Sequence, residues 1–385
     1  MNNPSYDIVV FSHLRWNFVY QRPQHILSRL AKKYKILFVE EPFYSNNQTD
    51  NCFTIRQVSP NLSVFNTHAE SIESTTEILR QYLENQTIGT AWFYSPAFVK
   101  ALDAISFERV VFDCMDELTL FKHAPQVLIE QEKELIDRSD IVFTGGKSLY
   151  SAKRKHHHNV HCFPSSVDRK HFEKAMNGIE VPSEMAAFTG TVVGYYGVID
   201  ERIDYELLEK TAQLCPVVDF VLIGPFAKVN PESLPALPNI HFLGMRSYEQ
   251  LPNYLKRFNV AMMPFAMNDA TKFISPTKTL EYMAGGKSII STPVYDVVRD
   301  YANHIEIINT ASEFALAIGR AIRQLGEGDV LKYQEILDKT SWDNTVSRMT
   351  ALMEQTADGE TCELEQKVKM NSPYLEPYTI GQYNY

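Results

Sequence analysis

The stretch NVAMMPFAMNDATKFISPTKTLEYMAGGKSIIST, residues 259–292, contains the pattern that decides the fold class. It begins with a short apolar run at 259–265 and ends with another at 287–292, as expected for strands that are covered on both faces of a sheet. Between them, Ser275 suits a helix N-cap, Pro276 suits the first helical position, and a glycine pair suits the helix end. Strand, helix and strand in this order predict one unit of a parallel sheet.

The same alternation of apolar runs and helical patterns extends outward in two series. The first series comprises residues 6–11, 35–40, 90–95, 109–114, 140–145 and 159–164. The second series comprises residues 191–197, 218–224, 239–244, 259–265, 287–292 and 304–309. We therefore predict an α/β protein of two Rossmann-like domains facing a cleft. The expected parts are a first domain at 1–175, a second domain at 176–345, and a helix end and tail at 346–385 that return toward the first domain.

The composition excludes several classes of protein. The 385 residues carry a formal net charge of −10, whereas nucleic-acid-binding domains are typically basic. Five dispersed cysteines indicate reduced thiols in a cytoplasmic protein, not a disulfide framework. No apolar stretch reaches the roughly 18 residues that a membrane helix needs, so we expect any membrane contact to be peripheral, at the inner face of the cell membrane.

Two phosphate-binding motifs can be set aside. TGGKS at 144–148 resembles the end of a P-loop, but the motif requires glycine at position 141, where this chain has isoleucine. No G-x-G-x-x-G follows the first strand of either series, so the sequence does not support a dinucleotide-dependent oxidoreductase.

Lys278 and Glu281 lie one helical turn apart in the expected helix of the opening stretch. One interpretation is a surface ion pair worth about 0.3 kcal/mol. However, a lysine in the first turn is repelled by the helix dipole unless an anion binds there, as in phosphate sites. Glu281 could accept hydrogen bonds from a vicinal diol such as a ribose, and a nucleoside diphosphate offers both groups. The spacing alone leaves the two interpretations open.

Several segments together resemble GT-B glycosyltransferases, particularly glycosyltransferase family 4. VAMMPF followed by SPTKTLEYMAGGKSIIST resembles the donor-binding segment of that family, and GYYGVIDERIDYELL (194–208) resembles the first loop of its donor domain. HCFPSSVDRKHF (161–172) resembles its strand-to-linker element, with Ser165-Ser166 in place of the usual Asn-Gly. SHLRWNFVYQRPQHILSRLA and VVFDCMDELTLF resemble a bacterial subgroup linked to surface-polysaccharide and teichuronic-acid-type synthesis.

The resemblance implies an enzyme, a metal-independent hexosyltransferase that needs no cofactor. It would move a sugar from a nucleotide diphosphate sugar, with a UDP-sugar favoured, to a glycan or lipid-linked acceptor, and it would bind no nucleic acid. The first domain would hold the acceptor and the second the donor. Two alternatives of the same architecture remain, a sugar-nucleotide 2-epimerase and a non-catalytic partner of an active glycosyltransferase.

The resemblance also assigns residues to the donor nucleotide. Glu281 occupies the position of a glutamate that binds the nucleotide ribose in the family. The helix start at Ser275, Thr277 and Lys278 would face the diphosphate. Gly197 would permit close backbone approach. Arg202 could meet the diphosphate, or it could simply pair with a neighbouring acidic residue.

Candidate residues for the acceptor side follow strands of the first series. We expect Asp113 and Asp116 just past a strand and facing the cleft, where a carboxylate could take the proton of the acceptor hydroxyl, with Asp116 the first choice. Helix capping is the alternative role for these aspartates. His13, Arg15 and Trp16 follow the first strand, and we expect them at the cleft rim, where they could bind a sugar or a lipid phosphate. Core packing of Trp16 and a solvated ion pair of Arg15 are the alternatives.

Phe273 marks a departure from the family pattern. Retaining members carry an E-x7-E pair, and its first glutamate would fall at position 273. That carboxylate normally contacts the donor sugar. The substitution leaves open the identity of the sugar, the retaining or inverting outcome, and whether the protein is catalytic.

Overall fold

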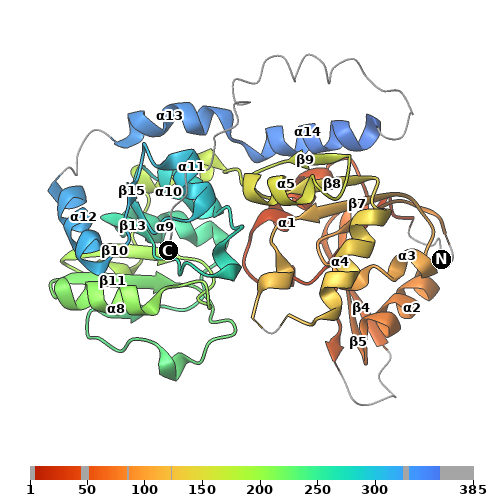
Figure 1. The fold of residues 1–385 in the computed structure, drawn as a ribbon, viewed down its shortest axis with the longest axis horizontal. Helices are drawn as coiled ribbons and strands as arrows, with labels where there is room; N and C mark the ends of the chain where they lie inside the picture. Colours follow the sequence, from red (N-terminus) through yellow and green to blue (C-terminus); the bar gives the residue numbers. More distant parts are fainter. Residues whose placement is uncertain (1–4, 45–51, 85, 123, 324–328, 356–385) are drawn as a thin grey trace.

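The computed structural model describes residues 5–44, 52–84, 86–122, 124–323 and 329–355. They form two α/β domains that lie side by side (Figure 1). The fold class therefore agrees with the prediction from the sequence. Within the described residues, no helix is both long and apolar enough to cross a membrane.

The first domain is built on a nine-stranded sheet in the order β3-β5-β2-β1-β6-β7-β8-β9, with β4 pairing on the outer side of β5. Only β4 is antiparallel to its neighbour. The strands are β1 (Ile8–Ser12), β2 (Ile36–Glu40), β3 (Phe43–Tyr44), β4 (Cys52–Ser59), β5 (Leu62–Ala69), β6 (Ile88–Phe93), β7 (Phe107–Cys114), β8 (Ile141–Thr144) and β9 (Val160–Cys162).

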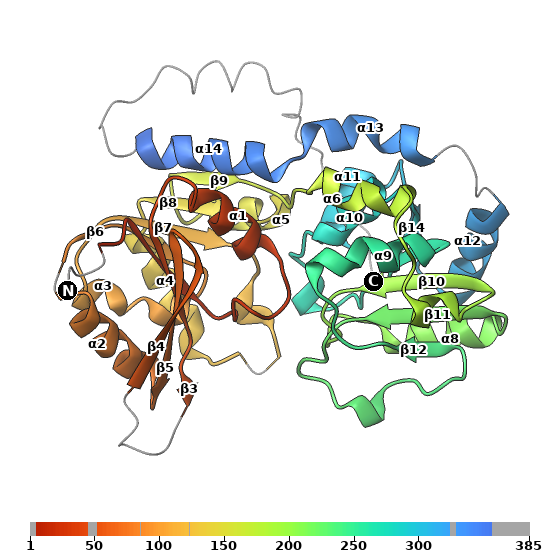
Figure 2. The same ribbon diagram turned by 180° about the vertical axis from the view of Figure 1, so that it is seen from behind.

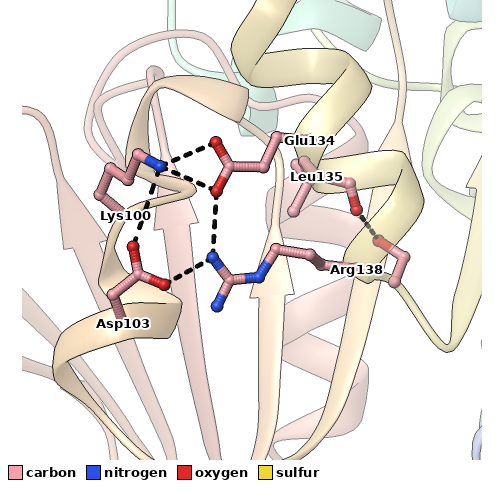
Figure 3. A network of polar contacts seen from close by, with 6 residues as sticks. Lys100, Asp103, Glu134, Leu135 and Arg138 are labelled. Atoms are coloured by element: carbon pink, nitrogen blue, oxygen red, sulfur yellow. Dashed lines mark hydrogen bonds and ion pairs between the residues drawn. The ribbon is translucent and has the colours of Figure 1, made fainter.

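Helices cover both faces of this sheet, as the continuous apolar runs indicate. Along β1, Val9 and Phe11 belong to one hydrophobic cluster, whereas Ile8 and Val10 belong to the cluster on the opposite face. The helices are α1 (Arg22–Leu30), α2 (Ile72–Tyr82), α3 (Ala101–Ala104), α4 (Val127–Arg138) and α5 (Lys147–Lys153). Figure 3 shows the contact between α3 and α4 at the surface, where Lys100, Asp103, Glu134 and Arg138 form a closed network of ion pairs.

The second domain has a six-stranded, fully parallel sheet in the order β12-β11-β10-β13-β14-β15. Its strands are β10 (Thr191–Tyr196), β11 (Val218–Ile223), β12 (Ile240–Phe242), β13 (Val260–Met263), β14 (Ser288–Ser291) and β15 (Glu306–Ile307). Its helices, including two short ones in the linker, are α6 (Arg169–Phe172), α7 (Ser183–Ala186), α8 (Tyr205–Leu214), α9 (Leu251–Arg257), α10 (Thr277–Ala284), α11 (Tyr295–Tyr301), α12 (Ala311–Arg323) and α13 (Asp329–Lys339).

The strand order reverses at one place in each sheet, between β1 and β6 and between β10 and β13. Ligands of open α/β sheets bind beyond the carboxyl ends of the strands at such reversals. The segments that follow β7, β9, β10 and β13 come together at the junction of the two domains. The topology therefore places the candidate site between the domains.

The last described helix, α14 (Trp342–Gln355), leaves the second domain and packs on the first (Figures 1 and 2). Trp342 and Met349 are part of a first-domain hydrophobic cluster, and Arg29 of α1 contacts Asp343 at 2.9 Å. In contrast, α13 remains on the second domain, where the hydroxyl of Tyr333 donates to the carbonyl of Lys287. The chain thus connects the two domains a second time.

Candidate functional site

A cleft of about 1130 Å³, measured with its open side, lies between the two domains. Both domains line it, and its lining includes the ionisable side chains Arg22 and Asp116 of the first domain and Arg202, Arg246, Lys278 and Glu281 of the second. Three of the four cations have a carboxylate partner. Arg22 pairs with Asp113, Arg202 with Asp200 and Arg246 with Glu184.

Lys278 is the exception. No described residue forms a hydrogen bond or ion pair with its Nζ, which lies over the rings of Tyr195 at 5.3 Å and Phe265 at 5.5 Å. Burial lowers the pKa of Lys278 to about 8, and the nearby Arg202 adds to this effect. Partial burial of a lysine that has no counter-ion among the described residues is costly, so an anion in the cleft would stabilise its charge.

Glu281 lies one turn further along α10 and is only 7% exposed. Burial raises the pKa of its carboxyl group to about 7, although Lys278 acts in the opposite direction. The two side chains are close enough to influence each other, but no ion pair joins them among the described contacts. The interpretation of a surface ion pair is therefore wrong, because both groups line the cleft and neither is at the outer surface.

The first turn of α10 starts one residue later than the sequence suggested. Pro276 occupies the N-cap position in an extended conformation, and no side chain caps the turn. Ser275 is therefore not the cap that we expected. Its carbonyl oxygen accepts a hydrogen bond of 2.7 Å from the hydroxyl of Ser165 in the first domain. Ser275 and Thr277 both line the cleft, so the uncapped N-terminus of α10 faces it.

Two glycines make room for the lysine beneath this turn. Gly197 has φ +141°, and a Cβ atom there would lie 2.9 Å from Cε of Lys278 and 3.2 Å from its Nζ. Gly224 has φ +156°, and a Cβ atom there would lie 1.8 Å from the carbonyl oxygen of Gly197. Side chains at either position would collide with this arrangement, so the glycines let Lys278 reach the cleft.

Arg202 forms the ion pair that was one of its two interpretations from the sequence, and it also lines the cleft. Its Nε and Nη2 donate to Asp200 at distances from 2.7 to 3.0 Å, which is the pairing alternative. Its guanidinium also lines the cleft and lies 5.7 Å from the ring centre of Phe121 in the first domain. Arg202 therefore has a fixed position near Lys278, and its charge is shared with Asp200.

Of the two candidate aspartates, only Asp116 lines the cleft. Asp113 lies inside β7, fully buried, where Nε and Nη2 of Arg22 donate to it at 2.8–3.1 Å. Our expectation that Asp113 faces the cleft is thus wrong, because its carboxylate is buried in an ion pair with Arg22. No described side chain hydrogen-bonds the Asp116 carboxylate, and burial raises its pKa while Arg202 and Lys278 counteract the rise.

The predicted rim residues after β1 do not line the cleft. Arg15 donates to Glu40 at 3.2 Å and lies 4.0 Å from the ring centre of Phe43, while Trp16 packs edge-on against Phe38. Burial lowers the pKa of His13 to about 4, so this imidazole is neutral near pH 7. The structural alternatives that we considered for Arg15 and Trp16 are the ones observed, because Glu40 at the end of β2 binds both residues.

The cleft instead receives residues 19–22, which sequence reasoning did not single out. Tyr20 stacks on Tyr248 of the second domain, with ring centres 4.5 Å apart. Arg22 opens α1 and also donates to the carbonyl of Phe163 at 2.7 Å. The Arg-Pro pair was the available signal, since proline favours the first turn of a helix and thus indicates that Arg22 lies at the start of α1.

The described residues contain no group of three or more histidine, cysteine, aspartate or glutamate side chains positioned to hold a metal ion. The described residues that line the cleft include basic side chains, and the N-terminus of α10 faces it. Together with Glu281 and Asp116, such groups would suit an anionic ligand that also carries hydroxyl groups.

Comparison with known sequences finds a similarity in the second domain. Residues 190–324 match the family described as "Glycosyl transferases group 1". The chain is also 23% identical over 217 residues to a putative teichuronic acid biosynthesis glycosyltransferase, TuaH, of Bacillus subtilis (strain 168). That match covers 52% of this chain and 54% of the relative, so the similarity spans about half of each protein.

Comparison with solved structures identifies the fold of both domains. Sucrose-phosphate synthase from Thermosynechococcus elongatus superposes with a TM-score of 0.67 at 15% identity, covering 90% of this chain and 98% of that one. An E. coli structure described as trehalose-6-phosphate bound with UDP-2-fluoro glucose gives 0.65 at 13% identity, with 90% and 99% covered. Anabaena HepE in complex with UDP and glucose gives 0.64 at 12% identity, with 91% and 99% covered. The chain therefore has the GT-B fold.

Proposed function

We propose that the protein is a glycosyltransferase that transfers a sugar from a nucleoside diphosphate sugar to a glycan or lipid-linked acceptor. The observation that carries this proposal is Lys278, which has no hydrogen-bond or ion-pair partner among the described residues and lies beside the first turn of α10, where no side chain caps the helix. Glu281 lies one turn further along the same cleft wall. Free N–H groups and a lysine suit a diphosphate, and a carboxylate suits the ribose hydroxyls. We therefore call α10 the donor helix.

The relatives support particular choices of donor and pathway. Two structural neighbours are described with UDP or a UDP-sugar bound, so a UDP-sugar is the favoured donor. The name of the Bacillus subtilis relative refers to teichuronic acid biosynthesis, which favours a role in surface polysaccharide synthesis. A lipid-linked acceptor would bring the protein from the cytoplasm to the inner face of the cell membrane as a peripheral protein.

In the proposed reaction, an acceptor hydroxyl oxygen forms a bond to the anomeric carbon while the bond from that carbon to the diphosphate oxygen breaks. The nucleoside diphosphate leaves with the electron pair, and the donor helix and Lys278 stabilise the charge that develops on it. They place positive charge where the diphosphate would lie, which is why we propose a metal-independent reaction. Asp116, on the opposite wall, takes the proton of the acceptor hydroxyl.

The presence of Phe273 in place of a glutamate supports a second candidate function, in which the protein is not catalytic. Its side chain packs against a hydrophobic cluster of the first domain and is not part of the cleft lining. The sugar contact that the first glutamate of E-x7-E would supply is thus absent from this position. A protein that binds nucleotide sugars without turning them over would then serve as a partner of an active enzyme.

Calorimetry of Glu281→Ala tests the donor assignment. With UDP, GDP and dTDP as probes, we expect the wild-type protein to bind one of them and the variant to bind it at least tenfold more weakly, since charged hydrogen bonds contribute about 1.5–3 kcal/mol. Glu232→Ala, at an exposed position of the same domain, is the matched control. Equal affinities of wild type and Glu281→Ala would contradict the assignment.

Incubation with a panel of UDP-, GDP- and dTDP-sugars separates the candidate functions. Slow hydrolysis of one donor in the absence of acceptor indicates a transferase. Isomerisation of the sugar indicates a sugar-nucleotide 2-epimerase, and binding without turnover indicates the partner protein.

A further inference from the structure

Ser165 and Ser166 follow β9 and are neighbours, yet their hydroxyl groups bond to different parts of the molecule. The hydroxyl of Ser165 donates to the carbonyl of Ser275 at 2.7 Å and lies 3.3 Å from the hydroxyl of Thr277. The hydroxyl of Ser166 is buried and meets that of Thr345 in α14 at 2.8 Å. Of the two hydroxyls, it is therefore that of Ser165 that reaches from the first domain to the start of the donor helix.

A second contact between the domains lies where α5 begins and involves α11 as well as Ser275. The backbone N–H of Ser148 donates to the carboxylate of Asp296 in the second domain, at 3.2 and 3.3 Å. Gly146 lies between the domains, and a Cβ atom there would be 3.1 Å from Cβ of Ser275 and 2.6 Å from Asp296. Gly146 of the TGGKS motif thus permits a close contact between the domains, which a larger residue would disturb.

Phe273 provides a third contact, since it packs on the hydrophobic cluster of the first domain that includes Leu149. Residues 273–277 therefore lie against the first domain although they belong to the second. These residues lead directly into the turn that carries Lys278. The donor helix has no capping side chain of its own, so the first domain contributes to the placement of this turn.

We propose that Ser165 is a positioning residue that couples contact between the two domains to donor binding. Its hydroxyl orients the Ser275–Thr277 backbone, so that the first-turn N–H groups and Lys278 converge on the diphosphate only when the domains are in contact. This inference rests on the proposed function, because it assigns a nucleoside diphosphate to the donor helix. Ser165 itself also lines the cleft, but both described contacts of its hydroxyl are with Ser275 and Thr277 at the start of the donor helix.

The coupling has a thermodynamic consequence. If the donor binds best when the domains are in contact, its apparent affinity depends on the fraction of molecules in that arrangement. Loss of the Ser165 hydroxyl lowers the fraction of free protein molecules whose domains are in contact. A saturating concentration of donor restores that fraction. The change should therefore raise the Kd and the donor KM, while kcat at saturating donor changes little.

Calorimetry with UDP provides the first test. For Ser165→Ala we expect a Kd about three- to tenfold higher than that of the wild type, the range for loss of one hydrogen bond. Ser165→Thr keeps the hydroxyl and should restore affinity. Ser166→Ala is the matched control, since it removes a buried hydroxyl from the same linker that bonds only to Thr345 among the described residues. We expect it to lower the melting temperature without changing the Kd.

Hydrogen exchange of the full chain without ligand provides the second test. Ser165→Ala should accelerate exchange of the amides of residues 273–280 relative to the wild type, and Ser166→Ala should not. If Ser165→Ala binds UDP with wild-type affinity, or exchanges at the wild-type rate, the inference is overturned and the proposed function stands. If the wild-type protein binds none of UDP, GDP and dTDP, the proposed function fails, and the coupling inference fails with it.

Discussion

The surface network of Figure 3 and the cleft each contain a lysine, but only the lysine of the network is paired with carboxylates among the described residues. Lys100 is 55% exposed and contacts Glu134 at 2.9 Å and Asp103 at 3.9 Å, while Arg138 contacts the same two carboxylates. The contact with Lys100 holds the pKa of Glu134 below its ordinary value. Lys278 is half-buried in the cleft, has no such partner among the described residues, and has a lowered pKa.

The difference is between charges that pair with one another and a charge that has no carboxylate partner among the described residues. An exposed network satisfies its members internally and contributes little to stability, since water competes for every contact. A half-buried lysine without such a partner reduces stability, and titratable groups with shifted pKa values are typical of functional sites. Substitutions in the cleft should therefore have large effects on binding and turnover, and substitutions in the surface network should have small ones.

Asp116→Asn should reduce the rate of sugar transfer about 10²- to 10⁴-fold, the usual contribution of a general base. An amide cannot take the proton of the acceptor hydroxyl, whereas donor binding uses the opposite wall of the cleft. Steady-state kinetics with the donor found by the panel, together with UDP calorimetry, measure the two quantities separately. Asp103→Asn in the surface network is the control, and an equal loss of rate in both variants would disprove a catalytic role for Asp116.

Lys278→Met should weaken UDP binding about 10- to 100-fold, since it removes a charged contact to the diphosphate. The same change should raise the melting temperature of the ligand-free protein by a few degrees. The pKa of Lys278 is lowered to about 8, so the folded state favours the neutral amine, and carrying the charge at pH 7 opposes folding. Differential scanning calorimetry tests the second effect. A lower melting temperature would show that the Lys278 charge stabilises the fold.

The affinity for UDP-glucose should be highest between about pH 7 and pH 8. As the pH falls through the pKa of Glu281, about 7, the carboxylate takes a proton and accepts hydrogen bonds from the ribose less well. As the pH rises through the pKa of Lys278, about 8, the amine loses its charge. UDP-glucose is the suitable probe because its diphosphate does not titrate in this range. Glu281→Gln should remove the acidic decline only, and a flat profile for the wild type would refute both assignments.

Lys100→Met should have the smallest effect. Exposed ion pairs contribute roughly 0–1 kcal/mol, so the melting temperature should fall by no more than a degree or two, and UDP affinity should stay at the wild-type value. Thermal denaturation of Lys100→Met beside Lys278→Met compares the two regions directly. Shifts of the same sign would contradict the distinction between paired and unpaired lysines.

Much of the fold was predictable because local patterns specify it. Every strand expected in the two series is present, since continuous apolar runs are characteristic of parallel strands covered on both faces. The pair β4 and β5 was missed. Phe53 and Ile55 alternate with polar residues there, which is the weaker pattern of a half-exposed hairpin, and β4 is exposed along almost its whole length.

The candidate site also contains residues that the sequence predicted and residues that it did not. Lys278 and Glu281 could be recognised from the sequence because one helix carries both, and a spacing of one turn places them on the same face. Asp113 and Asp116 are three residues apart, but their environments depend on Arg22, which is distant in the sequence and pairs with Asp113. Their position after β1 led us to predict that His13, Arg15 and Trp16 lie at the cleft rim. Hydrogen bonds from Arg15 and from the backbone N–H of Trp16 to Glu40, on the neighbouring strand, hold these two residues away from the cleft.

The sequence by itself therefore determined the two parallel-sheet domains and the donor helix with its lysine and glutamate, because periodicity and helical spacing act over a few residues. Only the tertiary structure decided which aspartate reaches the cleft, which lysine lacks a partner among the described residues, and that Ser165 of the first domain holds the start of the donor helix. Those outcomes depend on contacts between distant segments, such as that of Ser165 with Ser275, 110 residues further along the chain. Burial and pairing in such contacts arise only when the two domains come together.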